Sequence, residues 1–109
     1  MGISDFVCYV LKVPVNLDGY VYICKAIRYV VDHNGESGFY EYLQSECHKS
    51  YACIEKGIRL AKNKALKRIL NEDFVKIYPI DQRAMKAKEF ICYAAQYYRK
   101  EFVNEKQKE

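Results

Sequence analysis

The side chains that could do chemistry in this sequence are mostly basic, and they are concentrated in one segment. Residues 49–68 hold seven Lys or Arg and one acidic residue, whereas residues 1–48 hold three bases and six acids. Residues 69–109 are close to balance, with eight bases and seven acids. The middle segment therefore carries most of the positive excess of a chain whose net charge is +4. Positive charge concentrated in this way favours binding to a polyanion such as nucleic acid.

Catalytic or metal-binding chemistry has much weaker support. Cys47, His48 and Cys53 form the one local cluster of possible metal ligands, but they lack the paired spacing of a zinc site. His48 and Cys53 are five residues apart and would not share a helix face. Phosphate-binding loops, dinucleotide fingerprints and nucleophile elbows are also missing from the sequence. We therefore expect no enzyme, no metal, no cofactor and no small-molecule substrate.

The spacing of apolar residues predicts that the basic segment is one helix, from Ser50 to Arg68, with Ser50 as its N-cap. Its buried stripe would contain Tyr51, Ile54, Ile58, Ala61 and Ala65. Its opposite, solvent-facing stripe would contain Ala52, Lys56, Arg59 and Asn63. Basic residues beside a small alanine suit a helix whose backbone approaches the major groove of DNA.

A shorter helix is predicted just before the basic one. Phe39, Tyr42 and Leu43 have helical spacing and would face inward, with Cys47 as a further candidate. His48-Lys49 leaves only a tight connection. A short helix, a tight turn and a basic helix follow the order of a helix-turn-helix, whose second helix reads DNA. The alternative interpretation of the basic face is a solvated surface without a partner.

The remainder of the chain predicts further helices. An apolar stretch before Pro14 would form a first helix, capped by Ser4 or Asp5. Asp18 is the expected N-cap of a second helix, which would end just before Gly35. The other expected elements are a loop over residues 36–38, a short helix or turn over residues 72–77, and a last helix that buries residues from Phe90 to Phe102.

Together these elements predict one all-α domain of about six helices. A chain of 109 residues has the length of a single domain, and five glycines and two prolines are few helix breakers. The core would span about residues 5–103, and residues 104–109 would form a charged, frayed tail. The five cysteines are odd in number and unpaired in spacing, which favours reduced thiols and a cytoplasmic protein. The sequence contains neither a signal peptide nor an apolar stretch that approaches a membrane span, so no membrane contact is expected.

Several blocks of the sequence resemble one known family. The opening blocks are Val13–Val15, Gly19–Tyr22 and the pair Ala26-Ile27; the later blocks are Ile54–Arg59, Glu89–Ile91 and the pair Ala94-Ala95. In this order they resemble the C-terminal DNA-binding effector domain of the master response regulator of sporulation in endospore-forming bacteria. The resemblance covers about residues 5–102.

This resemblance implies an all-helical domain of about six helices with an embedded helix-turn-helix. It also implies binding to short promoter boxes, with domains in tandem on DNA, and base- or phosphate-facing roles for Glu55, Lys56 and Arg59. The chain departs from the family in lacking the phosphorylatable receiver domain. It also has Cys53 where the family usually has an arginine, and Gly57 where the family has an alanine, at a cost of about 1 kcal/mol in helix propensity.

The sequence thus predicts a single DNA-binding domain that regulates transcription. Its expected partners are double-stranded DNA and a second copy of the domain, in a homodimer or a tandem array. The expected base-facing residues are Ala52, Cys53, Glu55, Lys56 and Arg59. The expected phosphate-facing residues are Lys49, Ser50, Lys62, Asn63 and Lys64. The alternative is a protein-interaction module of the same fold with weakened DNA binding. Cys53 and Gly57 favour that alternative, and the net charge of residues 49–68 disfavours it.

Overall fold

Helices are the regular elements of this computed structural model, which describes residues 1–35 and 38–103, and no strand occurs within those ranges. The six α-helices of the described chain are α1 (Ile3–Asp5), α2 (Asp18–His33), α3 (Phe39–Cys47), α4 (Tyr51–Arg68), α5 (Asn71–Ile77) and α6 (Ala87–Tyr98). Two π-helical turns, η1 (Phe6–Val10) and η3 (Arg99–Val103), and a 3-10 turn, η2 (Gln82–Ala84), complete the set. The prediction of an all-α fold with about six helices is confirmed.

The helix ends show which sequence signals were informative. Ser50 caps α4 as predicted, because its Oγ accepts a hydrogen bond from the Cys53 backbone amide at 3.2 Å. Asn34 ends α2 in the left-handed conformation (φ 52°), where its amide donates to the Val30 carbonyl. The prediction for Asp18 was wrong by one position, since Leu17 is the N-cap residue and makes no side-chain cap. Glu36-Ser37 of the expected loop and the expected tail, residues 104–109, lie outside the described residues.

The first helix also begins earlier than its polar residues predicted. It starts at Ile3, before either expected cap, because Ile3 is buried against the core. It continues into η1 and ends before Lys12, whose φ of 63° redirects the chain ahead of Pro14. The N-terminal segment thereby places Phe6 and Val7 inside the protein, where both are fully buried.

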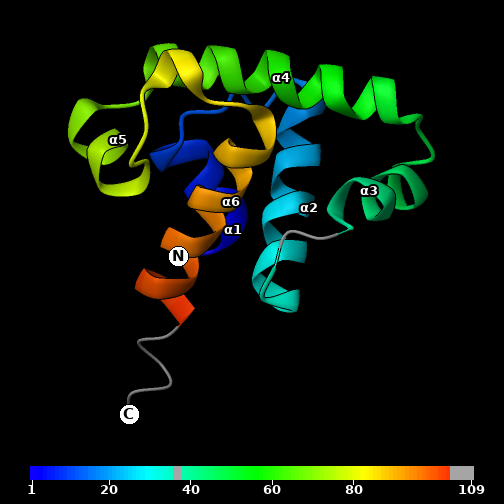
Figure 1. The fold of residues 1–109 in the computed structure, drawn as a ribbon, viewed down its shortest axis with the longest axis horizontal. Coiled ribbons are helices and arrows are strands. Elements are labelled where there is room, and N and C mark those ends of the chain that lie inside the picture. The colour runs from blue at the N-terminus through cyan, green and yellow to red at the C-terminus, as the bar shows by residue number, and fades with distance from the viewer. Residues whose placement is uncertain (36–37, 104–109) are drawn as a thin grey trace.

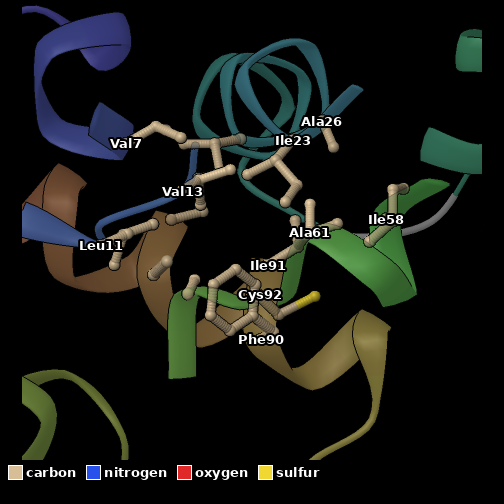
Figure 2. Packing of buried hydrophobic residues seen from close by; sticks show 14 of the residues in the cluster. Val7, Leu11, Val13, Ile23, Ala26, Ile58, Ala61, Phe90, Ile91 and Cys92 are labelled. Carbon is tan, nitrogen blue, oxygen red and sulfur yellow. The ribbon is translucent and has the colours of Figure 1, made fainter. Parts of the chain in front are cut away.

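α2 lies at the centre of the packing and contacts α4, α6 and α3. Figure 2 shows side chains of the N-terminal segment, α2, α4 and α6 meeting in one apolar cluster. Ile23, Ile58 and Phe90 are each fully buried there. The described helices include none that is long and apolar enough to cross a membrane.

α2 and α4 approach each other most closely at two glycines. A Cβ on Gly19 would lie 2.2 Å from the Gly57 carbonyl oxygen and 2.6 Å from the Ala61 Cβ. A Cβ on Gly57 would lie 2.7 Å from the Tyr22 ring, which is itself buried. The low helix propensity of Gly57 therefore has a packing reason, because an added Cβ there would crowd the ring of Tyr22.

α4 is the longest helix, with 18 residues, and lies across one end of the molecule (Figure 1). In that view α2 and α6 run away from its inner side, with α3 near one end and α5 near the other. The inner face of α4 is therefore covered by the rest of the domain, and its outer face is left open to solvent.

Candidate nucleic-acid interface

The outer face of α4 carries the stripe predicted from the sequence. Ala52, Lys56, Arg59 and Asn63 are all exposed, and so are the further expected contact residues Lys49, Ser50, Cys53 and Lys64. Lys67 and Arg68 extend the exposed basic surface through the last turn of the helix. On the inner face Ile54, Ile58, Ala61 and Ala65 are fully buried, as the spacing predicted.

Tyr51 was wrongly predicted to belong to the buried stripe, since it is 53% exposed. It occupies the first turn of α4, where the helix extends beyond the core, and its ring packs against Tyr40 of α3 with centroids 4.9 Å apart. Tyr51 therefore links the two helices at the surface and is not part of the interior.

The connection from α3 to α4 is three residues long. His48 takes the left-handed conformation (φ 55°), and its amide donates to the Gln44 carbonyl, so that it ends α3. Ser50 then opens α4. The two helices contact each other, and α3 buries Phe39 and Leu43 in the core. Tyr42 and Cys47, which were expected to face inward, are only half-buried.

Two of the expected base-facing residues are paired with each other. The Arg59 guanidinium donates to both carboxylate oxygens of Glu55, at 3.0 and 2.8 Å, one helical turn earlier. Both side chains remain partly exposed, so the pair is accessible to solvent. A surface pair of this kind contributes little to stability, about 0.3–0.5 kcal/mol. Arg59 can therefore exchange Glu55 for another acceptor at a small cost.

Lys62 does not lie on the outer face, and its expected role as an exposed phosphate contact must be corrected. The residue is only 8% exposed, and its Nζ donates to the Met85 carbonyl oxygen at 2.8 Å. Burial lowers the pKa of this ammonium, and the nearby Arg59 lowers it further. Lys62 follows Ile58 by four residues and precedes Ala65 by three, so it lies beside the buried stripe.

An apolar hollow opens on the other side of α4, where small residues leave room. It has a volume of about 280 Å³, and Leu17, Asp18, Gly19, Tyr22, Cys53, Lys56, Gly57 and Leu60 line it. Leu60 is 49% exposed, and the sequence interpretation did not identify it as part of this face. Only its position two residues after Ile58, away from the buried stripe, could have indicated its exposure.

The cysteines and histidines do not form a metal centre. All five cysteines have free thiols, and Cys47 is half-buried while His48 and Cys53 are exposed. Within residues 1–35 and 38–103, no three His, Cys, Asp or Glu side chains gather closely enough to hold an ion.

Comparison of the chain with family models, with curated proteins and with solved structures finds no match.

Proposed function

We propose that this domain binds double-stranded DNA by inserting the outer face of α4 into the major groove, and that it regulates transcription. The observation that carries the proposal is the division of α4 into two faces. Its inner side is fully buried, and its outer side bears exposed bases along its length, including Lys56, Lys64 and Lys67. A single helix of this kind, open along one face, has the shape and charge that the major groove accepts.

The proposed contacts follow the positions of the side chains on α4. Arg59 and Lys56 would meet base edges, beside Ala52, Cys53 and Glu55, and Arg59 would exchange Glu55 for a guanine. The proposed phosphate contacts are Lys49, Ser50, Asn63 and Lys64. Lys62 is no longer among these outer-face contacts, because its ammonium is buried against Met85.

The proposed role in transcription is supported by the arrangement of α3 and α4 and by the sequence resemblance. α3, the three-residue connection and α4 have the order of a helix-turn-helix. The resemblance to sporulation response-regulator effector domains adds promoter binding, with domains paired or in tandem on DNA. Free thiols at all five cysteines support a cytoplasmic location.

A salt series with matched charge variants tests the proposal. Fluorescence anisotropy would measure binding to duplexes of random sequence for the wild type, Lys64→Gln and Lys100→Gln. Lys100 is exposed in η3, at the end of the chain away from α4 in Figure 1. Lys64→Gln should lower the dependence of log affinity on log salt by about one, because one phosphate contact is lost. Lys100→Gln removes the same charge and should leave the slope unchanged.

Recognition of the DNA base sequence is tested by a second comparison, on duplexes selected from a random library. Arg59→Ala should cost about 1–3 kcal/mol on a selected duplex and much less on a scrambled one. Equal losses on both duplexes would rule out readout by Arg59. Failure of the wild-type protein to bind duplex DNA at low salt would rule out the proposed function itself.

The second candidate is a protein-interaction module, and the exposed Leu60 beside the apolar hollow favours it. Apolar atoms at the middle of a DNA-facing helix are less useful for phosphate binding than for packing against another protein. In that case Leu60→Gln would abolish self-association in sedimentation experiments, whereas Lys64→Gln would not.

A further inference from the structure

A second basic surface lies between the first half of α4 and the beginning of α6, and the sequence interpretation did not identify it. The surface is a groove of about 410 Å³, open to solvent. Its walls come from α3, α4 and the segment that leads into α6: Tyr40, Tyr51, Glu55, Arg59, Lys62, Met85, Lys86, Ala87 and Lys88.

Four cations line this groove, whereas its described lining includes one acidic residue, Glu55. Glu55 holds the Arg59 guanidinium. Glu89, next to the groove, accepts a hydrogen bond from the Lys86 backbone amide at 3.0 Å. The described lining therefore holds more basic than acidic side chains. Lys86 and Lys88 are exposed, so their side chains can reach an incoming anion.

Lys62 makes the excess of positive charge most evident, because its ammonium is buried. Its Nζ donates to the Met85 carbonyl oxygen, and within the described chain it takes part in no ion pair. An ammonium has three hydrogen-bond donors, and a buried charge is normally compensated by an opposite charge. Glu55 and Glu89 act on this ammonium only through longer-range electrostatic attraction. An oxyanion in the groove would add a direct counter-charge and further acceptors.

Tyr40, which also lines the groove, adds a neutral donor. Burial raises the pKa of Tyr40 to about 12, so its hydroxyl keeps its proton at neutral pH and can donate to an oxyanion. Tyr51 packs on the Tyr40 ring with centroids 4.9 Å apart and holds it in place.

We propose that this groove is a phosphate-binding site, which in a complex with DNA takes a backbone phosphodiester beside the major groove occupied by α4. Lys62, Lys86 and Lys88 supply the charge, and Tyr40 supplies a hydroxyl donor. The DNA part of this inference rests on the function proposed above. The phosphate part does not, and the two can fail separately.

The phosphate part is tested without DNA. Thermal unfolding would be followed in sodium phosphate and in sodium chloride of equal ionic strength at pH 7, for the wild type and for Lys86→Gln/Lys88→Gln. Phosphate also stabilises proteins in general by exclusion from their surface, so a control is needed. The control is Lys76→Gln/Lys100→Gln in α5 and η3, which has the same loss of charge at exposed lysines away from the groove.

We expect phosphate to raise the midpoint of the wild type and of the control by the same amount, and that of the Lys86/Lys88 variant by clearly less. An equal rise in all three proteins would overturn the groove as a phosphate site. Because the exchanged lysines are exposed, both variants should fold, which a chloride-only melt would verify.

The DNA part uses the same variants in an anisotropy salt series. Lys86→Gln/Lys88→Gln should weaken binding to every duplex alike and preserve the order of preference among sequences. The slope of log affinity against log salt should fall by about one to two, because one or two phosphate contacts are lost. The matched control is Lys76→Gln/Lys100→Gln, which lies in α5 and η3. If the wild type binds DNA and the Lys86→Gln/Lys88→Gln variant has the same salt slope as the wild type, the phosphodiester assignment is overturned. A phosphate effect in a protein that does not bind DNA would keep the groove as a site for free phosphate groups and overturn the proposed function.

Discussion

The partial burial of Tyr40 makes the stability of the domain depend on pH. Tyr40 lies between Phe39 and Tyr51, and burial raises its pKa from the usual 10.0 to about 12, with Tyr51 and Glu55 adding to the effect. In the unfolded chain the same phenol ionises near pH 10. Its contribution to stability is therefore fully present below pH 10 and is lost as the pH rises towards 12. Tyr78, which is fully buried, has a raised pKa and acts in the same direction.

The first prediction concerns the alkaline stability of Tyr40→Phe. The wild-type free energy of unfolding should be nearly constant up to about pH 10 and then fall. In Tyr40→Phe the fall should be less steep, because one group that ionises preferentially in the unfolded chain is gone. Urea midpoints measured from pH 7 to pH 11.5 would show this. Tyr9→Phe is the matched control, since Tyr9 is 64% exposed and its loss should leave the curve unchanged. An equally steep fall in Tyr40→Phe would contradict the partial burial of the phenol.

At this scale the sequence predicts the middle of each helix face better than its edges. Lys56 and Ile58 lie near the centres of their stripes, and both were placed correctly. Lys62 lies beside the buried stripe, and its burial depends on the Met85 carbonyl, which is 23 residues away along the chain. Helical spacing contains no information about such a distant partner, so the groove between α4 and α6 could not be found from the sequence.

Among the helices, the close crossing of α2 and α4 depends on two glycines, Gly19 and Gly57, which have no side chain at the contact. At Gly19 an added Cβ meets backbone atoms of Gly57, which cannot rotate away. At Gly57 it meets the ring of Tyr22, which can shift, and an alanine there also gains about 1 kcal/mol of helix propensity. The two glycines should therefore respond differently to the same substitution.

The second prediction is that Gly19→Ala destabilises the domain by about 1–3 kcal/mol or more, because α2 and α4 must separate. Gly57→Ala should cost clearly less, since the gain in propensity offsets part of the crowding. Gly2→Ala is the control, because a Cβ at Gly2 meets nothing within 4 Å. Urea unfolding of the three variants gives the comparison. A Gly19 variant as stable as the Gly2 variant would show that the helices do not approach this closely.

The extents of these elements were mostly predictable, but their crossing was not. α2, α3, α4 and α5 were each predicted to within about two residues, because apolar spacing, glycines and polar caps act locally. In the sequence alone, Gly57 indicated a weakened recognition helix. The structure gives it a packing role that depends on Tyr22 of another helix. The predicted DNA contacts remain predictions, since they depend on a partner.

Across the whole molecule, charge and packing are arranged around α4. The segment from Lys49 to Arg68 holds the basic excess, while the other parts of the chain together are slightly acidic. If the proposed binding to DNA occurs, the field of the duplex would orient the molecule with α4 towards it. The two ends of the described chain are joined by a hydrogen bond. The Tyr98 hydroxyl donates to the Met1 carbonyl oxygen at 2.7 Å, which connects α6 to the N-terminus.

The last prediction follows from this closure. Phe6 is fully buried, and its ring contacts the rings of Tyr97, Tyr98 and Phe102, at centroid distances of 6.1, 5.3 and 6.1 Å. Because these contacts join both ends of the chain to one core, the domain should unfold in a single step. Phe6→Ala should then lower the free energy of unfolding by about 3–5 kcal/mol. Tyrosine fluorescence and far-ultraviolet circular dichroism in urea should give the same midpoint, lowered for the variant, with an unchanged slope. Two separate transitions, or a midpoint equal to that of the wild type, would show that the N-terminal segment is not an integral part of the fold that supports α4.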